Sequence, residues 1–173
     1  FVNKLDKENA HFNKVVSDLH IEFGKKVIPL TLMLGEGDKF EGIIDVLDKK
    51  AYTYENGEKK EVEIPEIRLA EVDAVYEEII EAVAETDDSL MEKFFEGEEF
   101  SESEFRIGLT QAILEGTVVP LVAGSSEKEI GLTQLLEVIT KYMPSIDDEV
   151  ANIGFRVKEG YEAFDPDEDA PFS

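Results

Sequence analysis

Three polar residues at the start of the chain are of types that could recognise a nucleotide base. Asn3, Lys4 and Asp6 form an N-K-x-D pattern between the apolar pair Phe1-Val2 and a helical pattern. A carboxylate at this place can accept hydrogen bonds from both the N1–H and the exocyclic amine of guanine. Adenine has no such donor pair, so a half-paired carboxylate would discriminate against it. The aliphatic stem of Lys4 can lie over a base face, and Asn3 can brace the loop.

The N-K-x-D pattern also has a structural explanation. Four such residues occur together often by chance, and a charged turn from a strand end to a helix would have the same composition. In that interpretation Asp6 or Asn9 caps the helix by accepting a backbone N–H bond. The three residues alone leave both interpretations open.

A second loop has the same position between a strand and a helix. Residues 124–128 (GSSEK) follow the apolar run 117–123 and precede a helical pattern over 131–143. The backbone N–H groups of such a loop can face the carbonyl oxygen of guanine, although a plain loop with serines near a helix start is the simpler alternative. Two loops at the ends of neighbouring strands would form one pocket at the carboxyl edge of a sheet, where α/β folds bind ligands.

Periodicity and turn signals predict the elements that position these loops. Helices are expected over 7–24, 66–85, 86–95, 101–115 and 131–143, and strands over 27–34, 40–47, 51–55, 61–64 and 117–123. Asn56-Gly57 predicts a tight hairpin, Gly24 and Gly97 are predicted to end helices, and Ser101 with Glu104 has the pattern of a capping box.

This order of elements predicts an α/β fold with an inserted α+β unit. The segments 1–24 and 117–146 would form part of one domain, and 25–116 would be the inserted subdomain. The tail, 147–173, has no sustained period and is predicted to be either a linker or the lead-in to a truncated further part. Phe1-Val2 would be the end of a strand whose start is missing, so the chain is expected to be an internal fragment.

Composition narrows the class of protein. The chain has 173 residues, of which 42% are hydrophobic, enough for one domain or two small ones. Lys plus Arg is 17 against 41 Asp plus Glu, a formal net charge of −24, so nucleic acids and anionic membranes would be repelled. There is no cysteine, no apolar run long enough to span a bilayer, and no histidine besides His11 and His20. We therefore expect a cytoplasmic protein that binds neither nucleic acid nor membrane directly and holds no metal.

The sequence lacks the parts that handle phosphates. It contains no G-x-x-x-x-G-K-[ST] loop and no D-x-x-G. Phosphoryl transfer depends on positioning phosphates, magnesium and a water molecule. No catalytic residue is therefore assigned, and this chain alone is predicted to be inactive. Residues 165–169 begin with the spacing of a calcium loop but lack its glycine, which argues against a calcium site.

The chain resembles elongation factor G, a translational GTPase, over nearly its whole length. FVNKLDKENAHF is similar to the guanine-recognition motif and following helix of that family, and VVPLVAGSSEKEIGLTQLLEVITKYMPS to the last strand, guanine-contacting loop and final helix of its GTPase domain. IPLTLMLGEGDKFEGIIDVLDKKAY and AVAETDDSLMEKFFEGEEFSESE resemble the subdomain inserted in that domain. DEDAPFS resembles the approach to the second, β-barrel domain. The resemblance implies that the chain is the end portion of a P-loop GTPase fold with its insert.

The resemblance assigns guanine contacts to six residues: Asn3, Lys4, Asp6, Ser125, Ser126 and Lys128. Asp6 would accept from the two guanine donors, and Lys128 would flank the base. The intact parent would be a GTPase that uses GTP or GDP with Mg²⁺ and drives translocation of tRNA and mRNA on the ribosome. The fragment itself is expected to bind GDP weakly or not at all, with no tightly bound cofactor.

The second loop departs from the family's usual Ser-Ala-Phe-Lys, because this chain has Ser-Ser-Glu-Lys. A glutamate near the base favours a divergent paralogue over the housekeeping factor. Ribosomal-protection and recycling GTPases share the two guanine motifs and are the nearest alternatives, although they differ in the inserted region. An acidic protein-interaction module without nucleotide binding is an alternative of another class, in which Asp6 would be only a helix cap.

The helix over 66–85 has a row of glutamates on or near its solvent side: Glu71, Glu77, Glu78, Glu81 and Glu85. The simplest explanation is a solvated helix face. In the family, the insert is implicated in contacts with the ribosomal stalk protein, and an acidic face would suit a partner with exposed lysines. The resemblance therefore implies the ribosome, including its stalk protein, as a partner.

Overall fold

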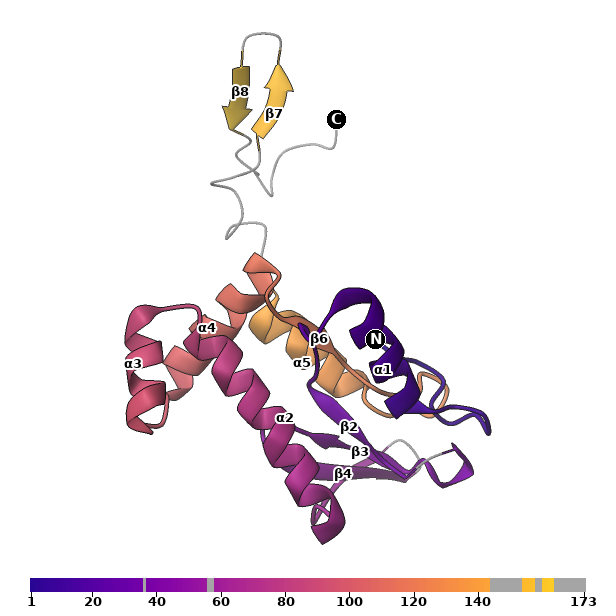
Figure 1. Ribbon diagram of the computed structural model, residues 1–173. Coiled ribbons are helices and arrows are strands. Elements are labelled where there is room, and N and C mark those ends of the chain that lie inside the picture. Colours follow the sequence, from indigo (N-terminus) through magenta and orange to yellow (C-terminus); the bar gives the residue numbers. More distant parts are fainter. Residues whose placement is uncertain (36, 56–57, 144–153, 158–159, 164–173) are drawn as a thin grey trace.

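The computed structural model describes residues 1–35, 37–55, 58–143, 154–157 and 160–163 (Figure 1). Its helices are α1 (Phe12–Phe23), α2 (Glu66–Ala84), α3 (Asp88–Glu96), α4 (Glu102–Glu115) and α5 (Leu132–Tyr142), with a 3₁₀ turn η1 (Gly37–Lys39). Its strands are β1 (Val27–Pro29), β2 (Thr31–Leu34), β3 (Gly42–Asp45), β4 (Lys50–Glu55), β5 (Glu58–Val62), β6 (Val119–Leu121), β7 (Gly154–Val157) and β8 (Gly160–Ala163). The predicted α/β fold class is confirmed.

Two sheets meet at Leu30. β1 and β6 pair in parallel, whereas β2, β3, β4 and β5 form an antiparallel sheet in that order. The Leu30 N–H donates to Leu121 O at 2.8 Å, and Leu30 O accepts from the Val46 N–H at 3.0 Å. Leu30 is therefore hydrogen-bonded to Leu121 of β6 and to Val46, which directly follows β3. In this way it couples the parallel pair to the antiparallel sheet.

The single strand predicted over 27–34 is wrong. The run divides into β1 and β2, and these pair in different sheets. Every residue of both strands is buried, so the apolar pattern gave no sign of the change of partner. This change of pairing partner falls at Leu30, inside the predicted inserted segment 25–116. Strand β1 of that segment therefore pairs with β6, which lies outside it.

Other strands are shorter or shifted relative to prediction. The strand expected over 40–47 is regular only over β3, and the strand expected over 61–64 is β5, which pairs with β4 so that Glu55 lies opposite Glu58. Gly42 allows β3 to lie against β4, because a Cβ there would be 1.9 Å from Tyr52 O. The predicted turn residues Asn56-Gly57 lie outside the described part of the chain.

Helix α1 begins at Phe12, later than predicted. Residues before it form turns instead, with Lys4 at a φ of 64° and the Lys7 N–H donating to Lys4 O at 3.2 Å. The N-cap residue is His11, whose side chain makes no cap hydrogen bond. The expectation that Asp6 or Asn9 caps this helix is therefore wrong, whereas Gly24 ends it as predicted, donating its N–H to His20 O at 3.0 Å.

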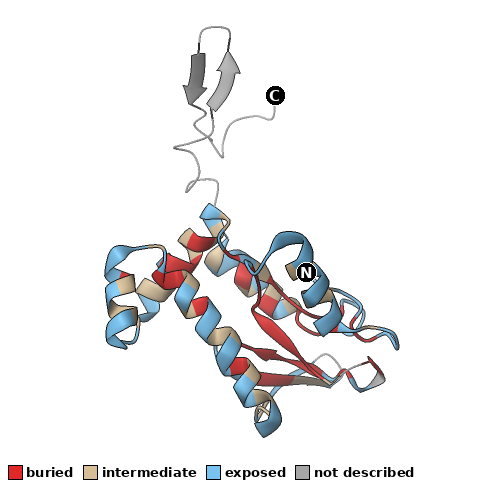
Figure 2. Cartoon of the chain, in the orientation of Figure 1, coloured by how far each residue is buried: buried red, intermediate tan, exposed pale blue. Residues whose placement is uncertain are grey.

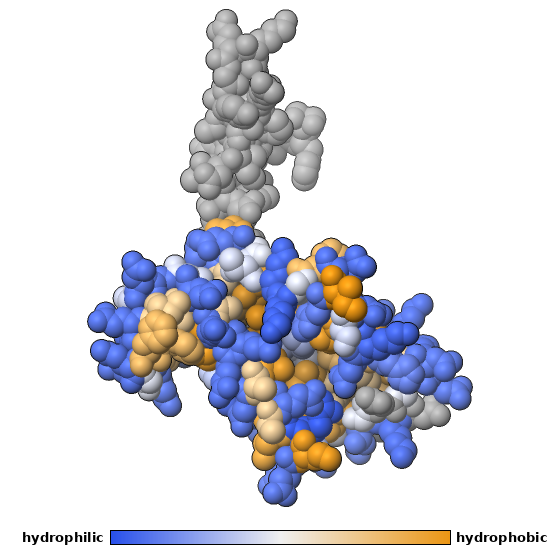
Figure 3. Space-filling model, in the orientation of Figure 1, coloured by the Kyte–Doolittle hydropathy of each residue, from blue (hydrophilic) through white to orange (hydrophobic). Residues whose placement is uncertain are grey.

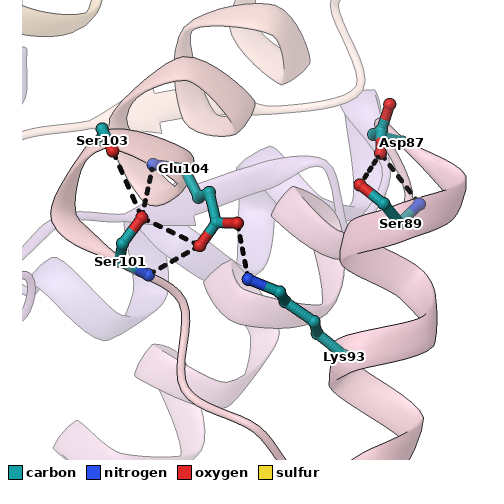
Figure 4. A network of polar contacts seen from close by, with 6 residues as sticks. All are labelled: Asp87, Ser89, Lys93, Ser101, Ser103 and Glu104. Carbon is teal, nitrogen blue, oxygen red and sulfur yellow. Dashed lines mark hydrogen bonds and ion pairs between the residues drawn. The ribbon is translucent and has the colours of Figure 1, made fainter.

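Helices α3 and α4 of the insert have the predicted capping residues (Figure 4). Asp87 caps α3 by accepting from the Ser89 N–H at 2.8 Å, and Gly97 ends it in a left-handed conformation. At α4, Ser101 Oγ accepts from the Glu104 N–H, and Glu104 Oε2 accepts from the Ser101 N–H, which confirms the capping box. Lys93 of α3 donates to Glu104 at 2.6 Å and, with the Ser101 bonds, lowers the pKa of Glu104 to about 2. This contact ties α3 to α4.

Helix α2 packs against α3, α4 and strand β1, and Figure 2 shows buried residues along these elements. Val72, Ile79 and Val83 form the buried side of α2. Gly108 of α4 lets the two helices approach closely, because a Cβ there would lie 2.7 Å from a methyl group of Val83. Arg68 of α2 also donates to Met33 O of β2 at 2.8 Å, which fixes the helix against the sheet.

The tail contains regular structure that the sequence did not predict. β7 and β8 pair antiparallel inside the segment expected to be a linker. Each strand is only four residues long, too short for periodicity to be detected. The run 165–169, considered for calcium, lies outside the described residues. No helix in the described part of the chain has the length and apolar character needed to cross a membrane.

Candidate functional site

The two predicted loops lie side by side, since each follows a strand end at the same edge. Val2 forms an isolated parallel bridge with Ala123, just beyond β6. The Val2 N–H donates to Val122 O at 2.8 Å, and the Gly124 N–H donates to Val2 O at 3.0 Å. The first loop begins at Asn3 and the second at Gly124, so both leave the carboxyl ends of neighbouring parallel segments. This is the juxtaposition that the sequence predicted.

The Asp6 carboxylate is the buried centre of the site. Its Oδ1 accepts from Ser125 Oγ at 2.6 Å, and its Oδ2 lies 3.0 Å from Lys7 Nζ. The Asp6 side chain is only 4% exposed, and Ser125 is fully buried. The Ser125 hydrogen bond outweighs the effect of burial and lowers the pKa of Asp6 from its ordinary value. Asp6 is thus an ionised acceptor held by the second loop, not a cap of α1.

Asn3 joins the loops through their backbones. Its Oδ1 accepts from the Lys4 N–H at 2.7 Å and from the Ser126 N–H at 2.9 Å. This is the bracing role predicted for Asn3. Lys4 is exposed beside it, and its left-handed backbone places it at the tip of the first loop.

The second loop is a tight turn closed on itself. Ser125 and Ile130 exchange backbone hydrogen bonds of 2.9 and 3.0 Å, and the Lys128 N–H donates to Ser125 Oγ at 3.2 Å. Gly131 has a φ of 79° and lies so close to Ala123 that a Cβ would be 2.3 Å from its carbonyl oxygen. Glycine is therefore required at the exit of the loop. Ser125 is held rigidly, while the Lys128 side chain is exposed.

The backbone donors expected to face a guanine carbonyl are already engaged in this structure. The Ser125 N–H donates to Ile130 O, and the Ser126 N–H donates to Asn3 Oδ1. The first of these bonds belongs to the fold of the loop. The second involves an exposed asparagine side chain, so the Ser126 N–H is the donor that a bound base could take over.

Sequence reasoning missed an ion pair that spans the site. Lys7 Nζ lies 2.6 Å from Glu127 Oε2 as well as 3.0 Å from Asp6 Oδ2, so it bridges one carboxylate on each loop. Lys7 and Glu127 are 120 positions apart, and no periodic pattern connects them. The available signals were the acidic side chain of Glu127 within the second loop and the position of Lys7 directly after Asp6.

A second buried polar group couples α5 to the antiparallel sheet. Tyr54 of β4 donates to Gln134 Oε1 at 3.0 Å, and Gln134 Nε2 has no partner among the described protein atoms. A cavity of about 20 Å³ lies between Thr31, Asp45, Gln134 and other residues. Burial raises the pKa of Asp45 to about 6, with smaller contributions from Asp48 and Glu137. The Asp45 carboxyl has a structural role, because its Oδ1 accepts from the backbone N–H groups of Leu47 and Asp48 in the turn that follows β3.

The predicted acidic face of α2 is exposed at four of its five glutamates. Glu77, Glu78, Glu81 and Glu85 are exposed, but Glu71 is half-buried. Glu71 Oε2 lies 2.6 Å from Arg68 Nε, so its charge is neutralised locally and it belongs to the packing of the helix. Figure 3 shows that the face of the molecule in view is largely hydrophilic, with scattered apolar patches.

Potential metal-ligating side chains are not clustered among the described residues. No group of three or more His, Asp or Glu side chains there is arranged to hold one. His20 has a structural contact, since one of its ring nitrogens lies 2.8 Å from Val27 O and links α1 to β1.

Comparison with known proteins finds a solved structure that is similar to most of this chain. No protein-family model matches the chain. A crystal structure of a protein from Thermus thermophilus is similar, with 37% sequence identity and a TM-score of 0.78. The similarity covers 88% of this chain and 23% of that protein, so this chain spans less than a quarter of its neighbour's length.

Proposed function

We propose that this chain is the guanine-recognition part of a longer translational GTPase of the elongation factor G type, together with its inserted subdomain. The observation that carries the proposal is the Asp6 carboxylate, which is buried at the ends of two parallel segments and held by Ser125. A carboxylate used only as a helix cap would bond to the start of α1, and Asp6 does not. The coverage of the Thermus thermophilus protein is consistent with further domains in the parent.

Each loop residue has a defined task in this proposal. Asp6 accepts from the N1–H and the exocyclic amine of guanine, and Ser125 holds its carboxylate in place. The exposed stem of Lys4 covers one face of the base. The Ser126 N–H exchanges its hydrogen bond with Asn3 Oδ1 for one with the guanine carbonyl oxygen. The exposed Lys128 flanks the base. GTP hydrolysis, with the phosphate contacts and Mg²⁺ that it requires, belongs to the parent's other segments.

The translational role is tested by GTP hydrolysis in the natural longer protein. We expect the hydrolysis rate to rise severalfold when ribosomes are added, because GTPases of this type need a partner to complete the arrangement around the phosphates. The reaction would be followed as phosphate release with and without ribosomes, and with ATP in place of GTP as control. Equal rates with and without ribosomes would contradict a translational role while leaving guanine recognition intact.

The exposed glutamates of α2 are proposed to meet the ribosomal stalk protein. Replacing Glu77 and Glu81 by lysine should weaken binding of the stalk's C-terminal domain at least about tenfold at low salt, and less at high salt. Asp18→Lys together with Glu22→Lys, on the exposed side of α1, makes the same change of charge elsewhere and should have little effect. Binding that is insensitive to salt, or equally weakened by both pairs, would contradict this surface assignment.

A further inference from the structure

The exposed Lys7 side chain lies against the buried Asp6 carboxylate, which is the proposed acceptor for guanine. Its ammonium group contacts Asp6 Oδ2 on one side and Glu127 Oε2 on the other. The Lys7 side chain is 52% exposed and that of Glu127 is 73% exposed, against 4% for Asp6. Lys7 and Glu127 thus have room to move, whereas Asp6 is fixed by Ser125.

Each of the two Asp6 carboxylate oxygens already has a partner in this structure. Oδ1 accepts from Ser125, and Oδ2 is paired with Lys7. Guanine offers two donors to a carboxylate and needs both oxygens, whereas hypoxanthine lacks the exocyclic amine and needs one. Each carboxylate oxygen can accept two hydrogen bonds, so Oδ1 can take a donor of the base beside Ser125. At Oδ2 the second donor of guanine competes with the Lys7 ammonium group, whereas hypoxanthine has no second donor.

We propose that Lys7 and Glu127 form a counter-charge pair that sets how strongly this site selects guanine. Lys7 occupies the Asp6 oxygen in the free protein and competes with the second donor of guanine. Glu127 gives Lys7 an alternative partner within reach, so the lysine can leave Asp6 without becoming an unpaired charge. Both are positioning residues that act through Asp6, and the inference rests on the guanine-binding function proposed above.

The test is a calorimetric titration of GDP and of inosine diphosphate into variants of the natural longer protein. Lys7→Met should tighten GDP binding by about two- to fivefold, the range typical of exposed ion pairs, and should leave inosine diphosphate binding unchanged. Glu127→Gln should weaken GDP binding by a similar factor, because Lys7 then keeps only Asp6 as a partner. In Lys7→Met/Glu127→Gln, GDP should bind as in Lys7→Met alone. Lys14→Met, on the exposed surface of α1, controls for the loss of a positive charge.

Four outcomes would overturn the inference. Weaker GDP binding in Lys7→Met would show that Lys7 supports the base instead of competing with it. An effect of Glu127→Gln that persists without Lys7 would show that Glu127 meets the nucleotide directly. Tight GDP binding that is the same in all variants would remove both roles and leave the proposed function standing, whereas no GDP binding to the unchanged protein would overturn the function as well.

Discussion

Replacing Asp6 by asparagine in the natural longer protein should lower its affinity for GDP by about a thousandfold or more. The Asp6 carboxylate is buried between the two loops and can accept both guanine donors, whereas an asparagine would turn an N–H₂ group toward one of them. Its remaining oxygen can still accept from Ser125, so the loops should stay joined. The loss corresponds to about 4 kcal/mol of binding free energy.

The same substitution should create affinity for xanthosine diphosphate. Xanthine has a carbonyl where guanine has its exocyclic amine, so the asparagine N–H₂ group has an acceptor and its oxygen can take the N1–H. Asp6→Ala is the matched control, because it removes the acceptor without supplying a donor and should lose both nucleotides. Titrations of GDP and xanthosine diphosphate into the three proteins measure these differences. GDP affinity within tenfold of the unchanged protein in Asp6→Asn would exclude Asp6 as the specificity residue.

Replacing Asp45 by asparagine should stabilise the chain at neutral pH. Burial raises the pKa of Asp45 from 3.8 to about 6, so folding disfavours its ionised form. At 1.36 kcal/mol for each pKa unit, the ionised carboxylate costs the folded state about 3 kcal/mol. An asparagine keeps an oxygen for the N–H groups of Leu47 and Asp48, which Asp45 now binds at 3.1 and 3.3 Å, and removes the charge.

The effect of Asp45→Asn should depend on pH in a defined direction. Below the unfolded pKa of 3.8, the carboxyl is protonated in both states and imposes no cost. The cost develops as the pH rises toward about 6 and is complete above it, so the variant should gain its advantage over that window. Urea unfolding of both proteins between pH 4 and 8 measures the difference, with the exposed Asp18→Asn as control. An advantage that is absent at neutral pH would show that the buried carboxylate is not destabilising.

The candidate site was predictable because its parts are local. The patterns that begin at Asn3 and at Gly124 each follow an apolar run, and parallel neighbours bring such loops to one edge. The capping box at Ser101 and the glycine at Gly97 were predictable for the same reason, since a few adjacent residues determine them.

The features that sequence reasoning missed depend on contacts between distant segments. The run around Leu30 is buried throughout, so nothing in it marks the exchange from the parallel pair to the antiparallel sheet. Asp45 lies within the apolar run 43–47, and its burial follows from the packing of α5 against the sheet. The Lys7–Glu127 pair depends on how the two loops close, which spacing along the chain does not reveal.

The most direct test of the account is a calorimetric titration of GDP, with ADP as control, into the natural longer protein. We predict tight binding of GDP and no measurable binding of ADP, because the fixed Asp6 carboxylate has two donors to accept from guanine and none from adenine at the same positions. Equal binding of both nucleotides, or binding of neither, would contradict guanine recognition by the two loops. The acidic interaction module would then be the better explanation of this chain.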